Sequence, residues 1–218
     1  MPKHSHRPTV FVTGQHHPPP PPPLPLGHRV QPSAPHPYLL TRGLYDSTLE
    51  QFELDCLGTP SVQKGRVLIP LHNASGELTG YAGRWPADPV PKERSKYRFI
   101  GEGEAEPFNL HRVLQVGSSI PVLITTAPFD VFHLWQSGYE SVIGLWTYEI
   151  RQAAIQRLLD HFPDRHFILL FDETERGRRL RLELLDRLGR FAFVRAMQFA
   201  EDERTVESLT RRDVKEEL

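Results

Sequence analysis

The sequence predicts an α/β fold in which a parallel sheet has helices on both faces, preceded by a smaller α+β region. From Ile120 onward, short β-prone apolar runs alternate with helical segments, the order expected of strands joined by helical crossovers. The run His166–Phe171 is almost continuously apolar, which is typical of a buried parallel strand. Further upstream, two β-prone segments flank the turn Asn73–Gly76 and predict an antiparallel hairpin.

Residues 1–36 have the composition of an extended arm. Pro18–Pro23 is an unbroken proline run, which favours a polyproline II rod, and six of the eleven histidines also lie in this region. Such sequence offers few apolar side chains to bury, so we expect the arm to be disordered and dispensable for folding. Recognition of the arm by a partner domain is the alternative.

A first folded subdomain is expected at residues 37–117. Ser47–Phe52 is predicted to be a helix that begins with a capping box, because Glu50 follows Ser47 at the required spacing. The strands of the hairpin are predicted at Arg66–Leu71 and Glu77–Arg84.

Basic and aromatic side chains are concentrated in the segment Arg84–Arg98. Its net charge is +3, and the rings of Trp85 and Tyr97 are interleaved with the cations. Lysine and arginine neutralise phosphates, and aromatic rings stack on bases, so the segment is a candidate nucleic-acid track. A solvated loop is the alternative interpretation.

The second domain, residues 118–218, is predicted to alternate strands and helices. The strands are expected at Ile120–Thr125, Ser141–Leu145, His166–Phe171 and Phe191–Ala196. The helices are expected at Phe129–Gln136, Glu149–Phe162 and Arg178–Leu188, with Gly138 as the C-cap of the first. The arginines that open the last helix, up to Arg181, are expected on a solvated face. This order predicts a parallel sheet covered on both sides.

An acidic turn follows the strand His166–Phe171. Asp172 stands at the carboxyl end of that strand, where open α/β sheets place their ligands. Carboxylates in this place commonly hold a hard divalent cation such as Mg²⁺. Two residues later, where a second carboxylate would point the same way, stands Thr174. The sequence therefore predicts a metal site that has lost part of its ligand set.

Composition narrows the class of protein. A net charge of −1 excludes a globally basic nucleic-acid binder, although it leaves room for a local basic groove. The single cysteine, Cys56, excludes an internal disulfide and a cysteine-rich zinc module. The chain has no apolar run of the roughly 18 residues that a membrane span needs, and no secretory signal. We therefore expect a cytoplasmic protein without membrane contact.

Several short motifs occur in an order known from one protein family. They are Tyr38–Leu44, Gly65–Leu71, Gly80–Arg84, Lys96-Tyr97 and Pro107–His111. In this order they resemble the catalytic core of bacterial DnaG-type primases, with its Toprim domain. The resemblance implies a Toprim-like sheet preceded by a primase-type subdomain with a track for single-stranded DNA template. It assigns nucleic-acid binding to Arg66, Arg84, Lys96 and Tyr97.

The resemblance also assigns catalytic and metal-binding roles, and here this sequence departs from the family. Thr126 stands in the position of the family's glutamate, whereas Asp130 and Asp172 keep the family's aspartates. Thr174 replaces a further aspartate, and Glu207 is a candidate for the last acidic ligand. Threonine has no group that titrates near neutrality, so Thr126 is expected to be inactive and Mg²⁺ weakly bound or absent. Asp130 is equally suited to stabilising a helix start.

The sequence is thus interpreted as a primase-like Toprim protein that binds single-stranded nucleic acid, with nucleotidyl transfer lost or weak. The first alternative is an active, divergent primase that makes RNA primers on single-stranded DNA with Mg²⁺. The second is a protein-interaction module. Replication or mobile-element proteins are considered as partners, and neither the family's zinc ribbon nor its helicase-binding domain is expected.

Overall fold

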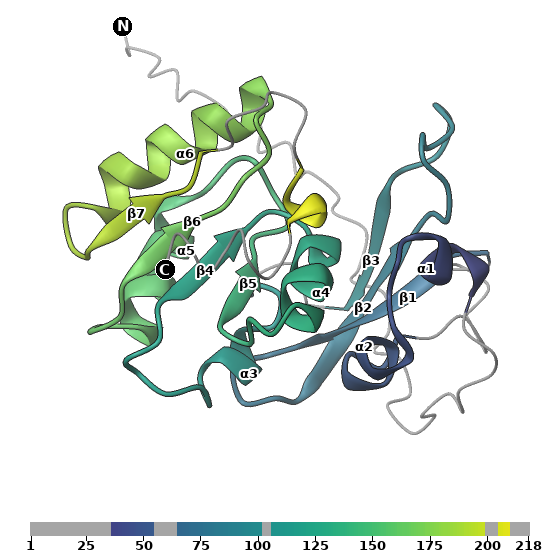
Figure 1. The fold of residues 1–218 in the computed structure, drawn as a ribbon, viewed down its shortest axis with the longest axis horizontal. Coiled ribbons are helices and arrows are strands. Elements are labelled where there is room, and N and C mark those ends of the chain that lie inside the picture. Colours follow the sequence, from purple (N-terminus) through teal and green to yellow (C-terminus); the bar gives the residue numbers. More distant parts are fainter. Residues whose placement is uncertain (1–35, 55–64, 102–105, 199–204, 210–218) are drawn as a thin grey trace, which may run out of the picture.

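The computed structural model describes residues 36–54, 65–101, 106–198 and 205–209 (Figure 1). The predicted arm, apart from His36, and the cysteine at position 56 lie outside the described residues. Within the described ranges, no helix is both long enough and apolar enough to cross a membrane.

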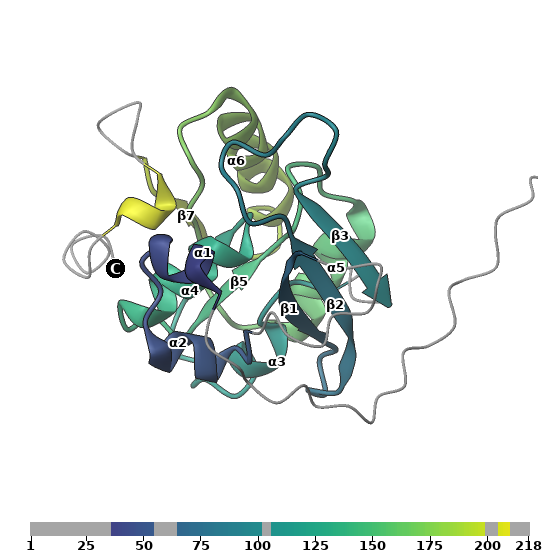
Figure 2. The ribbon, with the colours of Figure 1, turned by 90° about the vertical axis from the view of Figure 1, so that its right-hand side faces the viewer.

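The first half of the chain forms a small antiparallel sheet with two short helices, α1 (Pro37–Thr41) and α2 (Asp46–Gln51). The sheet has the order β1-β2-β3, and Figure 2 turns it toward the viewer. Its strands are β1 (Val67–His72), β2 (Leu78–Arg84) and β3 (Tyr97–Gly101). The predicted hairpin is confirmed, with Val67 opposite Arg84. Strand β3 was not predicted, although Tyr97 and Phe99 face the core on either side of exposed Arg98.

The predicted capping box of α2 is wrong. The helix begins at Asp46, and its N-cap residue Tyr45 has no side-chain cap. A side chain from elsewhere in the chain takes over part of this role. The amide oxygen of Gln136 accepts from the Tyr45 N–H at 3.3 Å and from the Thr48 hydroxyl at 3.0 Å. A tertiary contact thus replaces the expected local one.

The second half forms the predicted parallel sheet, in the order β5-β4-β6-β7. The strands are β4 (Val122–Thr125), β5 (Val142–Gly144), β6 (Phe167–Leu169) and β7 (Val194–Ala196). The helices are α3 (Leu110–Val113), α4 (Pro128–Gln136), α5 (Gln152–His161) and α6 (Glu175–Leu188). A final 3-10 turn, η3 (Val206–Ser208), contacts α4 (Figure 1).

Alternate residues of the parallel strands face opposite sides of the sheet, as the pleat requires. On one side, Leu123 and Ile168 share a core with Phe132 of α4 and with residues of the antiparallel sheet. On the other side, Ile124 and Leu169 belong to a second core with residues of α5 and α6. Helices therefore cover both faces, as predicted, and the two sheets are joined through the first core.

Helix α6 begins three residues earlier than predicted. The hydroxyl of Thr174 accepts from the Gly177 N–H at 3.1 Å, so Thr174 is the N-cap. The placement of Arg181 on a solvated face is also wrong. This side chain is buried and forms an ion pair of 2.5 Å with Glu173. Helix α4 ends at Gln136 with Ser137 as its C-cap, so the cap lies one residue earlier than predicted, and Gly138 follows with φ +95°.

Candidate functional site

The predicted metal-site residues gather at the carboxyl edge of the parallel sheet. Thr126 and Asp130 follow β4, Asp172 and Thr174 follow β6, and Glu207 lies on η3. Asp130 as a residue is 5% exposed. Burial raises its pKa to about 7, and the negative charges of Asp172 and Glu207 act in the same direction. The structure thus brings the three acids into one electrostatic neighbourhood.

Asp130 is hydrogen-bonded within its own chain segment. Its Oδ2 accepts from the Thr125 hydroxyl at 2.6 Å and from the Ala127 N–H at 3.1 Å. The second bond satisfies an amide at the start of α4, where a carboxylate also interacts favourably with the helix dipole. The helix-stabilising role considered for Asp130 therefore has direct geometric support.

The remaining candidate ligands also have partners inside the protein. Asp172 Oδ1 accepts from the Val206 N–H at 3.0 Å, and Thr174 caps α6. Glu207 forms a close ion pair with Arg42 and lies 3.8 Å from the imidazole of His133. Among the described residues, no group of three or more His, Cys, Asp or Glu side chains could hold a metal ion.

Magnesium requires near-octahedral oxygen coordination, and this arrangement does not preassemble it. Binding of Mg²⁺, weak or absent, stays a prediction. Thr126, which the sequence resemblance aligns with a glutamate, is 5% exposed, and its carbonyl accepts from the Trp146 N–H at 2.8 Å. This side chain supplies neither a carboxylate for a metal nor a titrating group for proton transfer.

Two of the predicted nucleic-acid-binding residues, Arg66 and Arg84, are buried. Arg66 donates to the carbonyls of Gly83 at 2.9 Å and Ser95 at 3.0 Å. Arg84 is 1% exposed, and its guanidinium donates to the carbonyl of Trp85. Both cations are used inside the fold, which the sequence pattern did not reveal.

The exposed cations lie in the connection between β2 and β3 and on β3 itself. They are Lys92, Arg94, Lys96 and Arg98. The guanidinium carbon of Arg94 is 4.7 Å from the ring centroid of Trp85. Tyr97 points inward, with its ring 5.5 Å from that of Trp146, and burial raises its pKa well above the ordinary value. Of the four predicted binding residues, Lys96 is the one that the structure places fully at the surface.

A polar network missed by the sequence analysis connects α1 to the β2–β3 connection. Asp88 Oδ2 accepts from the hydroxyl of Tyr38 at 2.6 Å and from Arg42 Nη1 at 2.5 Å. Its Oδ1 accepts from Arg84 Nη2 at 2.5 Å. Burial alone would raise the pKa of Asp88, but the Tyr38 hydrogen bond and the Arg84 charge hold it below its ordinary value. The excess positive charge of the segment Arg84–Arg98 was the one sequence signal for this network. It did not show which cations would pair with Asp88.

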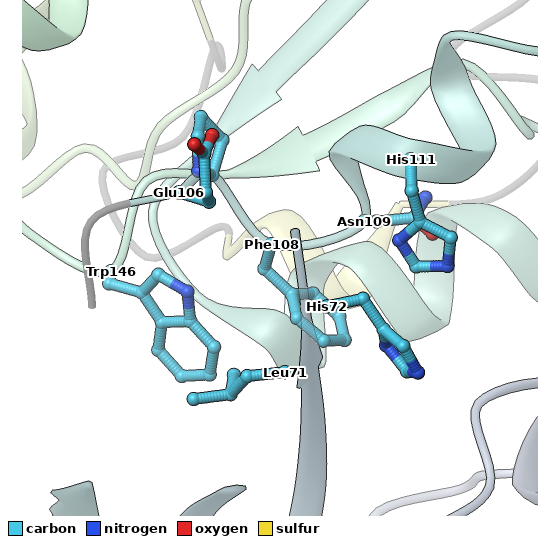
Figure 3. A pocket seen from close by; sticks show the side chains of 8 residues that line it. Leu71, His72, Glu106, Phe108, Asn109, His111 and Trp146 are labelled. Atoms are coloured by element: carbon cyan, nitrogen blue, oxygen red, sulfur yellow. The ribbon is translucent and has the colours of Figure 1, made fainter. Parts of the chain in front are cut away.

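A small cavity lies beside β1 and α3 (Figure 3). The rings of His72 and His111 line it with their centroids 4.6 Å apart. Burial lowers the pKa of both, that of His111 to about 4, so they are neutral at pH 7. The volume is about 10 Å³, room for one water molecule, whereas ligand pockets usually exceed roughly 300 Å³. This cavity is therefore not a nucleotide pocket.

No protein-family model matches the sequence, and no curated protein matches it. The structure, however, is similar to solved primase structures. The zinc-binding and RNA polymerase domains of Aquifex aeolicus primase align with TM-score 0.68 and 18% identity, covering 83% of this chain and 53% of that one. A DNA primase domain from Pseudomonas aeruginosa aligns with TM-score 0.64 and 20% identity, over 81% and 67% of the two chains.

A DnaG primase catalytic domain bound to single-stranded DNA aligns with TM-score 0.65 and 19% identity, over 83% of this chain and 68% of that one. This chain has the fold of a DnaG primase catalytic core. That result confirms the predicted fold class. The chain spans from about half to two thirds of the length of these structures.

Proposed function

We propose that this chain is a primase-like, Toprim-containing protein that binds single-stranded nucleic acid and has little or no nucleotidyl-transfer activity. The exposed cations of the β2–β3 region carry the proposal, since Lys92, Arg94 and Lys96 project from one connection and Arg98 follows on β3. Phosphate neutralisation by such side chains is independent of base sequence. The ring of Tyr97 packs in the core, so backbone charge is expected to dominate over base stacking.

The acidic edge of the parallel sheet supports the proposed loss of transfer activity. Phosphoryl and nucleotidyl transfer with two metal ions needs carboxylates that clamp a pair of cations roughly 3.5–4 Å apart. Here threonine stands at two of the family's carboxylate positions, and the remaining acids have internal partners. Primer synthesis is therefore expected at or near background with Mg²⁺ or Mn²⁺.

Binding is tested by fluorescence anisotropy of a labelled single-stranded DNA oligonucleotide at several salt concentrations. Arg94→Ala with Lys96→Ala should weaken binding. It should also lower the log–log salt slope by about 1.4, since each phosphate contact on a single strand contributes about 0.7. The matched control removes two exposed arginines, Arg151, the N-cap residue of α5, and Arg190, which follows the C-cap of α6.

Equal affinity of the Arg94–Lys96 variant and the control would favour the protein-interaction alternative. Template-dependent primer synthesis by the unmodified chain, lost on Asp172→Ala, would instead favour the divergent primase. The same anisotropy titration with single-stranded RNA defines which nucleic acid is preferred.

A further inference from the structure

Three hydrogen-bond donors from two separate parts of the chain converge on the carboxylate of Asp88. They are the Tyr38 hydroxyl, Arg42 Nη1 and Arg84 Nη2, at 2.6, 2.5 and 2.5 Å. Two guanidinium groups with an added hydroxyl donor form the kind of arrangement that proteins use to hold phosphate oxygens. A built anion site is therefore present, and a side chain of the protein itself fills it.

The two guanidinium donors, Arg42 and Arg84, also have contacts that do not involve the carboxylate. The guanidinium carbon of Arg84 lies 5.4 Å from the Tyr38 ring centroid and 5.6 Å from that of Tyr97. Arg42 is held by its other terminal nitrogen, which pairs with Glu207, and lies 4.9 Å from the centroid of the Phe129 ring. Removing the carboxylate would thus leave both guanidinium groups in place.

Asp88 is the most exposed member of the cluster. Its side chain is 42% exposed, against 22% for Arg42 and 1% for Arg84. It also lies in the connection between β2 and β3, whereas Arg84 is on β2 itself. The anion is therefore the part of the cluster that can leave with the smallest change in structure.

We propose that the Asp88 carboxylate occupies a phosphate-binding site and that a phosphodiester group of bound nucleic acid displaces it. The nature of the ligand rests on the proposed function. A phosphodiester carries one negative charge, as the carboxylate does, so the exchange preserves the charge balance with Arg42 and Arg84. In the pairing of β2 with β3, Arg84 lies directly opposite Tyr97. Lys96 precedes Tyr97 in the chain, so the site adjoins Lys96 and continues the row of exposed cations.

The anion site is tested first without nucleic acid. Thermal unfolding of Asp88→Asn is measured with and without inorganic tripolyphosphate, at ionic strength matched with NaCl. The melting temperature of the variant should rise by several degrees with the anion, because a ligand that binds only the folded state stabilises it, whereas the wild type should respond little. Asp186→Asn is the matched control, since Asp186 pairs with Arg190 in an exposed contact and the charge change is the same.

Adding Arg42→Gln to Asp88→Asn should abolish the response to tripolyphosphate. If Asp88→Asn is only destabilised and responds to the anion no more than Asp186→Asn does, the carboxylate is purely structural and the proposal fails.

Oligonucleotide binding supplies the second arm. Asp88→Asn should bind single-stranded DNA about tenfold more tightly than the wild type, within the usual range of intramolecular coupling, while Asp186→Asn should match the wild type. Unchanged affinity in Asp88→Asn would overturn displacement by nucleic acid. A tripolyphosphate response without oligonucleotide binding by any variant would refute the proposed function, yet support the anion site. Titration with ATP then tests a nucleotide as the source of the phosphate.

Discussion

The acidic edge of the parallel sheet and the basic β2–β3 region use their charges in different ways. At the acidic edge, Asp130, Asp172 and Glu207 all bond to groups of the protein itself. In the basic region, Arg66 and Arg84 are also internal, but Lys92, Arg94 and Lys96 project into solvent. A charge has less capacity for an external ligand as long as its internal partner stays bound. The difference therefore favours binding over catalysis.

The largest effect expected at the acidic edge is on stability. Glu173→Ala leaves the buried guanidinium of Arg181 without its carboxylate, which should lower the free energy of unfolding by about 3–5 kcal/mol. Chemical denaturation measures this change. Asp186→Ala breaks the exposed pair between Asp186 and Arg190 and should cost no more than about 1 kcal/mol. Similar losses in the two variants would contradict the structural role of Glu173.

The next effect is a dependence of stability on pH that arises from Asp130. The pKa of its carboxyl is about 7 in the folded chain against a reference value of 3.8. Between these values the folded chain keeps a proton that the unfolded chain has released. Stability is therefore highest on the acid side and falls as pH rises toward 7, by about 1.4 kcal/mol per pH unit from this group.

Asp130→Asn should remove this contribution. From pH 5 to pH 8, the free energy of unfolding of the variant should rise by about 3 kcal/mol relative to that of the wild type. Urea denaturation at both pH values measures the difference. Asp186→Asn serves as the control and should follow the wild type. Parallel behaviour of wild type and Asp130→Asn would show that the carboxyl is ionised in the folded chain at pH 5.

The smallest expected effect is on Mg²⁺ binding, when one carboxylate is added to the acidic edge. Thr174→Asp keeps the N-cap of α6, because aspartate caps helices as well as threonine does. It also restores a carboxylate near Asp172, so Mg²⁺ binding measured by calorimetry should tighten several-fold, about 1 kcal/mol. Thr174→Asn caps equally without the charge and should bind like the wild type. If both variants bind Mg²⁺ alike, the edge does not accept a metal at this position.

Local patterns were sufficient to place the main strands along the chain and to predict that they run parallel. The apolar runs around Leu123, Ile143 and Ile168 predicted strands of a parallel sheet because their periodicity and spacing are short-range properties. Which strands are neighbours, with β4 between β5 and β6, is known only from the pairing in the fold. Strand β3 was missed because the alternation around Phe99 is embedded in a strongly charged segment. The segment Tyr97–Gly101 forms a strand because it pairs with β2, a contact that the local pattern does not show.

The candidate site was predicted less completely, since its partners are distant in sequence. The sequence located Asp130, Asp172 and the substitution at Thr174, but it did not reveal which groups would bond to them. Arg42 pairs with Asp88 across 46 positions and with Glu207 across 165. No local pattern reports such contacts, so the burial of Arg84 and the convergence on Asp88 emerged only from the fold.

The ion pair between Arg42 and Glu207 also has a consequence for synthesis on the ribosome. The two residues are 165 positions apart, so Arg42 leaves the ribosome well before its partner is made. At about 5–20 residues per second, this interval is roughly 10–30 s. During that time α1 has only its nearer contacts, such as that with Asp88. In nascent chains, the N-terminal region around α1 is therefore expected to reach its final set of contacts only when the turn containing Glu207 emerges.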